Sequence, residues 1–310
     1  MTLEVIRQRP RSRSEIDGLC GSLDVSIKAV TDLHVGWVQF RLGVSEEEVT
    51  AVLRRTGDWI KAVNELARSL KLDYQPFCEC GGVPTIPGAT VKGNVRSRIE
   101  LGFREKDGRV RSCFVEAGGG RGSWRHQKIW EEVIRKQRPN QCEFKPQLGI
   151  DKVCLICDLF GTTSLAGLVR FSDFAGPDVI LAEEDFDFNI KLKVAPKNSI
   201  FRGRIDFFNL KPEELGLLLL GMGMEGGAEG RPVLMGRLKY RHYDRIGQVK
   251  YGLERVRLSE ISKGHLFGVV HPGEEVDGTK VAGELINRAR DVYKDFQPVD
   301  EVKNLAEVRR

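Results

Sequence analysis

A Pro-Gly turn that opens directly into a helix constrains the fold of this chain most strongly. Residues 86–96 read Ile-Pro-Gly-Ala-Thr-Val-Lys-Gly-Asn-Val-Arg, and Lys92 and Arg96 share one face of the expected helix at i, i+4 spacing. The unpaired amides of a first helical turn and the positive end of the helix dipole attract anions, and two cations one turn further on extend that attraction. The sequence therefore predicts a phosphate-binding helix start. The alternative is an ordinary glycine-containing turn before a solvated basic helix.

The charged residues are unevenly distributed along the chain. The net charge of +5 over 310 residues says little by itself. Basic residues greatly outnumber acidic ones between positions 92 and 138, whereas acidic residues gather at 46–48 and 183–187. Such segregation produces a local positive potential, which favours a polyanion as partner. The alternative is a solvated basic surface.

The first half of the chain alternates between short strands, helices and glycine-rich turns. Residues 1–18 hold four arginines and little apolar content, which predicts a flexible basic arm that touches nucleic acid. Alternating apolar residues predict a strand over 23–33. A capping box at Ser45 and helical apolar spacing predict one amphipathic helix to about Leu72. We expect a loop over 73–84, the basic helix to about Gly102, and a flexible loop over 116–122.

The second half continues in the same manner. We expect strands over 168–174, 200–210 and 233–241, a hairpin or long loop over 179–194, a helix over 212–220 and a glycine loop over 221–230. Strands and helices interleave without the strict alternation of a parallel sheet, so the sequence predicts an α+β fold.

Seven cysteines include a Cys154-x-x-Cys157 pair, the spacing of a zinc half-site. Cys142 and His126 lie upstream and predict a structural Zn²⁺ site of three cysteines and one histidine. Cys78-x-Cys80 or Cys113 are the alternative partners of the same turn, and buried thiols without a metal are the remaining alternative. No apolar run is long enough to cross a membrane and the N-terminus is polar and basic, so we expect a cytoplasmic protein without a membrane partner.

Four features in this order resemble the RAMP superfamily of CRISPR-associated proteins. They are Leu-His-Val-Gly at 33–36, Ile-Pro-Gly-Ala-Thr-Val-Lys-Gly at 86–93, Cys-Leu-Ile-Cys-Asp-Leu-Phe-Gly at 154–161 with Val-Arg-Phe-Ser-Asp at 169–173, and the glycine-rich loop over 221–236. The resemblance implies a modified RRM-like ferredoxin fold as palm. It also implies a single domain over 19–310, with a helical insertion at about 40–72, a basic cysteine-containing insertion at about 104–160 and a thumb-like hairpin at about 175–197.

Within that superfamily the chain is most similar to the backbone subunit of type III (Csm or Cmr) effector complexes. This resemblance implies that the protein binds CRISPR RNA, assembles with further copies of itself or paralogues and with other subunits of the effector complex, and acts on paired target RNA. The residues that we expect to contact RNA are His34, Gly88, Thr90, Lys92, Gly93, Arg96, Arg231, Arg237 and Lys239.

The resemblance also implies an aspartate upstream of the Pro-Gly motif that supports target cleavage with a divalent cation such as Mg²⁺, and Asp73 stands there. Two features depart from the family pattern: the sequence is Asp-Tyr-Gln-Pro rather than Asp-x-Pro, and a long helix precedes it. A noncatalytic capping subunit of the same complex is therefore an alternative. A stand-alone processing nuclease of the repeat RNA, with His34 as catalyst, is another. No nucleophile elbow or Walker loop is present, which gives other hydrolase and NTPase classes little support.

Overall fold

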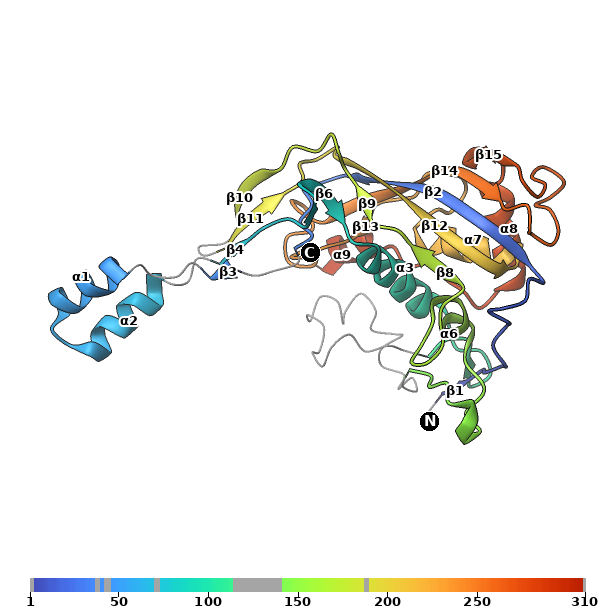
Figure 1. The fold of residues 1–310 in the computed structure, drawn as a ribbon, viewed down its shortest axis with the longest axis horizontal. Helices are drawn as coiled ribbons and strands as arrows, with labels where there is room; N and C mark the ends of the chain where they lie inside the picture. The colour runs from blue at the N-terminus through green and yellow to red at the C-terminus, as the bar shows by residue number, and fades with distance from the viewer. Residues whose placement is uncertain are drawn as a thin grey trace.

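The computed structural model describes residues 3–36, 40–41, 46–69, 73–113, 141–186 and 190–308. Its largest feature is one antiparallel sheet, curved across the molecule, with helices packed on one face (Figure 1). The strand order of this sheet is β13-β14-β2-β12-β9-β6-β5, with β15 also paired to β14 and β8 also paired to β12. The chain is therefore α+β, as the sequence predicts. The flexible loop expected at 116–122 and most of the basic stretch after Cys113 lie outside the described residues.

Three strands of eleven residues form the centre of the sheet: β2 (Leu19–Ala29), β12 (Ile200–Leu210) and β14 (Gln248–Leu258). β2 pairs antiparallel with both others, with Phe201 opposite Ile27 and Tyr251 opposite the same residue. Alternate side chains such as Leu23 and Val25 are buried beneath the helices. On the opposite face, Arg202 pairs with Glu254 at 3.1 Å. The open face thus carries cross-strand ion pairs, which neutralise one another.

The helices α3 (Gly88–Gly102), α7 (Pro212–Gly221) and α8 (Ala282–Val292) cover the buried face of the sheet. α3 and α7 confirm the two helices expected at these positions. A Cβ on Gly216 of α7 would lie 1.9 Å from the carbonyl oxygen of Leu285 in α8, so only glycine allows this helix contact. The backbone amide of Lys211 donates to the Glu214 carboxylate at 2.8 Å and begins α7.

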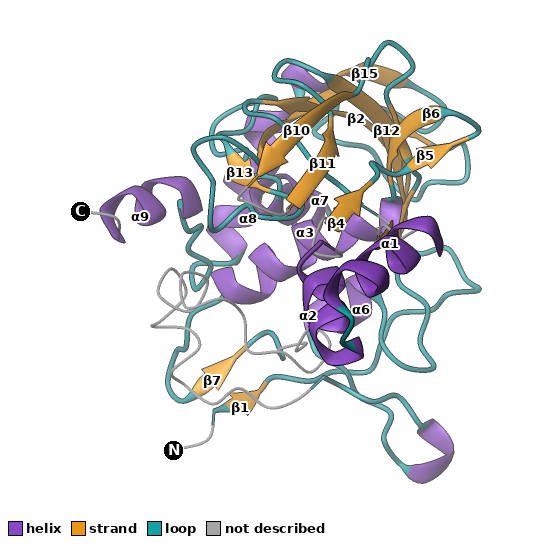
Figure 2. Cartoon of the chain, turned by 90° about the vertical axis from the view of Figure 1, so that its left-hand side faces the viewer, coloured by secondary structure: helices purple, strands orange, loops and turns teal. Residues whose placement is uncertain are grey.

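The helical insertion consists of two helices, α1 (Glu46–Thr56) and α2 (Trp59–Ser69), rather than the single helix expected. Gly57 between them has φ +59°, a left-handed conformation that ends α1. The Asp58 carboxylate accepts the amide of Ile60 at 2.9 Å and starts α2. The pair projects away from the sheet (Figures 1 and 2), and Trp59 is 64% exposed.

A second, smaller sheet has the order β10-β11-β4-β3. β10 (Ala182–Phe186) and β11 (Ile190–Val194) form the expected hairpin, and β11 pairs in parallel with β4 (Asp73–Gln75), which also pairs with β3 (Phe40–Arg41). The loop expected over 73–84 is therefore wrong, because three short strands lie there: β4, β5 (Glu79–Cys80) and β6 (Val83–Ile86). β6 joins the main sheet through β9 (Phe174–Ala175).

The strand expected over 233–241 is much shorter. β13 contains only Val233–Leu234, and the chain then turns. Gly236 has φ +81°, and a Cβ there would lie 2.2 Å from the carbonyl oxygen of His34, so the turn rests closely on the segment after β2. The remaining strands and helices are β8 (Val169–Phe171), β15 (Glu275–Asp277), α6 (Leu155–Phe160), α9 (Glu301–Val308) and the short 3₁₀ turns Pro146–Leu148 and Gly278–Lys280.

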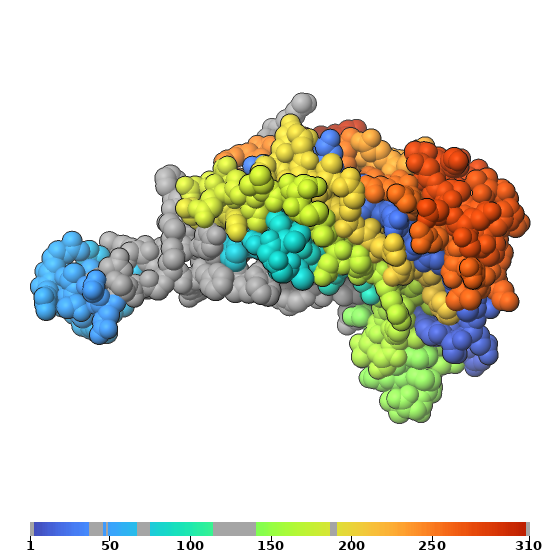
Figure 3. Space-filling view, turned by 45° about the horizontal axis from the view of Figure 1, so that its top comes forward, coloured from blue at the N-terminus to red at the C-terminus, as the bar shows by residue number. Residues whose placement is uncertain are grey.

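The N-terminal segment is docked, not a free arm as the sequence suggests. β1 (Glu4–Val5) pairs in parallel with β7 (Arg109–Val110), and Leu3 and Val5 are buried. The segment continues along residues 141–167, which form a lobe at one end of the molecule (Figure 3). Ion pairs described below, rather than apolar burial, hold most of it in place.

Candidate nucleic-acid interface and metal site

The start of α3 is largely occupied by the protein's own groups. The amide of Gly88 donates to the Asp173 carboxylate at 2.7 Å, and the amides of Thr90 and Val91 both point to the carbonyl of Pro87. A Cβ on Gly88 would lie 2.4 Å from the carbonyl oxygen of Phe171, which explains the glycine. The expected cradle of unpaired amides is therefore filled at its first position by an aspartate, and an external anion has to rely on side chains.

Lys92 lies one turn further along α3 and is half-buried. It has no hydrogen-bond or ion-pair partner within the described part of the chain. Burial lowers the pKa of Lys92 below its usual value, and the neighbouring charge of Arg96 lowers it further. Gly93 beside it is exposed with open space around its Cα, and Thr90 is half-buried. A partly desolvated cation with no counterion among the described residues is thus available for an anionic ligand.

Arg96 is used within the protein and differs in this respect from the phosphate-binding role expected for it. Its side chain is 14% exposed, its Nε donates to Glu100 at 2.7 Å, and its other nitrogens donate to the carbonyl of Gly161 at 2.9 Å and the sulfur of Cys157 at 3.5 Å. The guanidinium therefore connects α3 to the turn that follows α6.

His34 is buried, with 1% of its surface exposed. Its Nδ1 lies 2.8 Å from the carbonyl oxygen of Lys193, so Nδ1 carries the proton, and Nε2 has no partner in the described structure. Burial lowers the pKa of His34 and keeps the ring neutral. A buried neutral ring cannot exchange protons with an RNA backbone at the surface.

The three basic residues expected to contact RNA after the glycine loop differ in their environments. Arg231 donates to Glu225 at 2.6 Å and to the carbonyl of Val299 at 2.7 Å, so it ties the loop to the C-terminal segment. Lys239 is half-buried over the ring of Tyr240, and burial lowers its pKa to about 8. Arg237 is exposed and has no ion-pair partner among the residues described.

Asp73 is the first residue of β4, opposite Ile190 of the hairpin strand β11 and Arg41 of β3. Ile190 pairs with Phe186 as the last described pair before the turn of the hairpin, so the backbone of Asp73 lies beside the turn end of the β10–β11 hairpin.

Four buried cysteines form the clearest site in the structure: Cys113, Cys142, Cys154 and Cys157, with all four sulfurs within 4.8 Å of one another. The sulfur of Cys113 lies 3.4 Å from that of Cys157 and 3.6 Å from that of Cys154. Four thiolates around a tetrahedral zinc ion, each about 2.3 Å from the metal, stand roughly 3.8 Å apart. The cluster therefore fits a metal such as zinc. Cys113, one of the alternative ligands that the sequence leaves open, supplies the fourth sulfur of the cluster. The histidine expected as the fourth ligand, His126, lies outside the described residues.

Short local contacts preorganise this cluster. Cys154 is the N-cap of α6 and accepts the amide of Cys157, which turns both sulfurs to the same side. Hydrogen bonds from Cys113 and the other thiols lower the pKa of Cys142. The hydrogen bond between Cys113 and Cys142 raises the pKa of Cys113.

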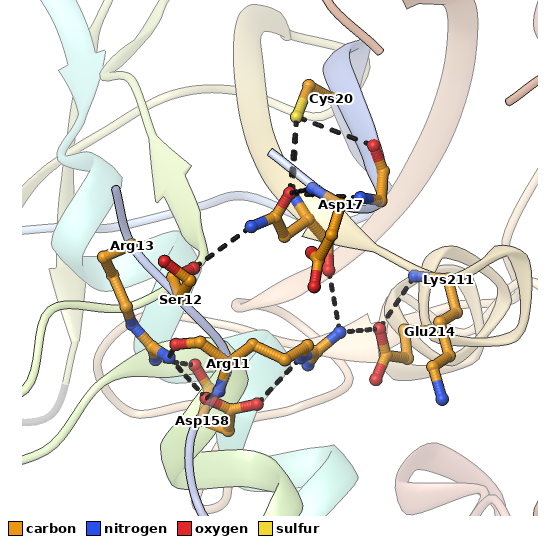
Figure 4. Close-up of polar contacts among 10 residues, drawn as sticks. Arg11, Ser12, Arg13, Asp17, Cys20, Asp158, Lys211 and Glu214 are labelled. Carbon is orange, nitrogen blue, oxygen red and sulfur yellow. Dashed lines mark hydrogen bonds and ion pairs between the residues drawn. The ribbon is translucent and has the colours of Figure 1, made fainter. Parts of the chain in front are cut away.

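A buried ion network next to the cluster was not predicted from the sequence. Arg11 donates to Asp158 at 2.9 Å and to Glu214 at 2.5 Å, and Arg13 donates to Asp158 at 2.7 Å (Figure 4). Asp158 is fully buried and follows Cys157 directly. The alternation of arginines at positions 7, 9, 11 and 13 was the only signal of this network in the sequence.

Comparison with known proteins identifies the family of this chain. The family model of the RAMP superfamily matches residues 26–251. A search of curated proteins found no match. Among solved structures, a chain of a "Type IV-B CRISPR Complex" is similar at 11% sequence identity and a TM-score of 0.36, covering 75% of this chain and 90% of that one. None of the described helices is long and apolar enough to span a bilayer. The family match covers well over half of the sequence, and the chain therefore belongs to the RAMP superfamily.

Proposed function

We propose that this protein is an RNA-binding backbone subunit of an RNA-guided CRISPR complex, as in the type III systems. The observation that carries the proposal is Lys92. A half-buried cation with no counterion in the described part of the chain is costly, and a phosphate of a bound strand would supply the missing charge. Exposed Gly93 beside it lets a backbone approach closely, and exposed Arg237 offers a second cation.

The topology supports a ferredoxin-like palm for this proposal. The elements β2, α3, β8, β12, α7 and β14 follow one another in the β-α-β-β-α-β order, and the strands stand side by side as β14-β2-β12-β8. The open face of the three central strands carries ion pairs such as Arg204 with Asp24. We therefore expect RNA along α3 and the hairpin, rather than stacked on the open sheet as in RNA-binding sheets that present aromatic rings.

The cysteine cluster is proposed to hold a structural Zn²⁺ through Cys113, Cys142, Cys154 and Cys157. A zinc ion bound by four thiolates would link the segment before residue 114 to the 141–167 lobe and add folding free energy to both. The metal has no open coordination position in such a site and supplies no chemistry to RNA.

Cleavage of paired target RNA through Asp73 and a divalent cation is proposed as an activity of the assembled complex. What supports it is the position of Asp73 upstream of the Pro-Gly turn and beside the turn end of the hairpin. Asp73→Ala in the complex is expected to abolish target cutting and leave RNA binding intact; continued cutting at the same positions would favour the capping role. Buried His34 disfavours the stand-alone processing nuclease, because its imidazole lacks access to a substrate.

Sequencing of co-purified RNA tests the proposed function. The tagged protein is isolated from its native host under mild salt, and the bound RNA is extracted and sequenced beside that from a Lys92→Ala form. We expect short RNAs with a common repeat-derived end, strongly depleted in the variant. Random fragments of cellular RNA in equal amount from both proteins would contradict the proposal.

A further inference from the structure

Arginines at alternate positions dock the N-terminal segment on the 141–167 lobe. We call residues 7–13 the N-terminal strap. The backbones of Gln8 and Val153 exchange two hydrogen bonds of 2.9 Å, so the strap runs beside the lobe in an extended conformation. Side chains two residues apart point to the same side of such a chain. Accordingly, every second strap residue reaches the lobe: Arg7 to Cys142 at 3.4 Å, Arg9 to Asp151 at 3.0 Å, Arg11 to Asp158 at 2.9 Å and Arg13 to Asp158 at 2.7 Å.

Arg7 differs from the other three because its partner is a sulfur. Its Nε donates to the Sγ of Cys142, and no carboxylate in the described structure lies within ion-pair distance of it. A neutral thiol is a weak acceptor, whereas a thiolate is a charged one. A guanidinium aimed at a cysteine sulfur is therefore best explained if Cys142 is a metal-bound thiolate.

A second guanidinium reaches the same cluster from another element, helix α3. Arg96 of α3 donates to the sulfur of Cys157 at 3.5 Å. A divalent metal with four thiolates carries a net charge of about −2, which is costly to bury without nearby donors. Donors to ligand atoms fix their orientation and tune metal affinity. The strap and α3 each supply one such donor.

We propose that metal binding at the four-cysteine cluster is coupled to docking of the N-terminal strap, with Arg7 as the positioning residue for the Cys142 thiolate. The inference rests on the metal site proposed above. Loss of the metal removes the thiolate that Arg7 contacts and loosens the lobe whose Asp158 anchors Arg11 and Arg13. Coupling of this kind is reciprocal, so loss of the Arg7 contact weakens metal binding by the same free energy by which the metal stabilises the strap.

Hydrogen exchange on the full-length protein tests the first half of this coupling. Exchange is followed by mass spectrometry in protein loaded with Zn²⁺ and in protein stripped with a chelator, with the central strand β12 as internal reference. We expect amides of residues 7–13 to exchange at least about 10-fold faster after stripping while β12 keeps its protection. Equal protection of the strap in both samples, or a global loss that includes β12, would overturn the proposal of a specific coupling.

Variants of the strap test the second half. Arg7→Gln is expected to lower Zn²⁺ affinity, measured by competition with a chelating indicator, by about 10-fold or more. Arg7→Lys should recover part of that loss. Arg9→Gln is the matched control, because Arg9 is 81% exposed and its partner is the carboxylate of Asp151 rather than a cysteine sulfur. An exposed ion pair contributes little to docking of the strap, so this variant should bind Zn²⁺ nearly as tightly as the parent protein.

A spectroscopic readout separates positioning from general stability. In Co²⁺-substituted protein, a hydrogen bond lowers the energy of the thiolate electrons, so its loss in Arg7→Gln should shift the sulfur-to-cobalt charge-transfer band to longer wavelength. An unchanged band with unchanged Zn²⁺ affinity would refute the role of Arg7. Protein that binds no Zn²⁺ at all would refute both the metal site and this coupling. The proposed RNA-binding function is tested separately, by the RNA that co-purifies with the parent protein and with Lys92→Ala.

Discussion

The amide of Gly88 and the carboxylate of Asp173 lie 2.7 Å apart, so the protein's own aspartate caps the helix that carries Lys92. The helix N-terminus, which would otherwise attract a phosphate, is thereby neutralised. Exposed Asp173 also adds a negative charge close to the proposed RNA path. The site thus combines an attractive lysine with a cap that limits its attraction.

Removal of that negative charge is expected to strengthen RNA binding. Asp173→Asn should raise affinity for a single-stranded RNA about 2- to 5-fold at low salt, because a repulsive charge near the phosphates is lost. The same change should lower the free energy of unfolding by about 0.5–1 kcal/mol, because the cap is weakened. Fluorescence anisotropy and urea unfolding measure the two effects. Asp178→Asn, at another exposed aspartate of the same region, is the control and should change neither.

The affinity for RNA is expected to depend on pH through Lys92. The pKa of Lys92 is lowered in the free protein, and a bound phosphate would raise it. At a pH between the pKa of the free protein and that of the RNA complex, binding of RNA is therefore accompanied by uptake of a proton. Affinity should be constant around neutral pH and fall as pH rises through the free-protein pKa, which lies below that of an ordinary lysine. Lys92→Arg should abolish this alkaline fall, because arginine stays charged. A parent protein whose affinity is as flat in alkali as that of the arginine variant would contradict the assignment.

Stability is expected to depend on pH through Lys239. Burial lowers its pKa to about 8 in the folded protein, whereas the unfolded chain retains the usual value near about 10.4. Between these values the unfolded chain binds more protons, so the free energy of unfolding should gain about 1–2 kcal/mol as pH rises. Lys239→Met should remove that gain and be the more stable protein at pH 7. The informative quantity is the difference between the two proteins in denaturant unfolding at pH 7 and pH 10; a difference that does not change with pH would exclude this lysine.

The buried ion network should be essential to folding. Asp158→Ala leaves the guanidinium groups of Arg11 and Arg13 without their carboxylate, and should cost about 3–5 kcal/mol of stability. Arg9→Gln breaks an exposed pair and should cost less than about 1 kcal/mol. Denaturant unfolding of the two variants compares them directly. Similar small losses in both would mean that the network is dispensable.

Local sequence patterns predict many of the helices and strands, whereas contacts between residues far apart in the sequence determine which side chains are available at the candidate sites. The strand at 200–210 and the helices after Pro87 and Lys211 follow from alternation, turn chemistry and caps, which act over a few residues. The docked strap could not be foreseen, because Arg11 finds Asp158 and Glu214 about 150 and 200 residues away. The spacing of Lys92 and Arg96 favours an RNA contact for Arg96, but Glu100 stands one turn along the same helix and pairs with it instead.

The cysteine site shows the same limit. The Cys154-x-x-Cys157 turn is recognisable from spacing, but nothing in the sequence selects Cys113 over other partners. Its sulfur joins the cluster through tertiary contacts, among them the pairing of β7 with the N-terminal strand β1 three residues before it.

The salt dependence of RNA binding tests the central claim most directly. Affinity of the parent protein and of Lys92→Ala for one single-stranded RNA is measured over a series of salt concentrations, with exposed Lys263→Ala as control. If Lys92 neutralises one phosphate, the logarithmic slope of the variant should be smaller by about 0.7 and its affinity lower at every salt concentration, while the control matches the parent. Identical slopes and affinities in all three proteins would contradict the account.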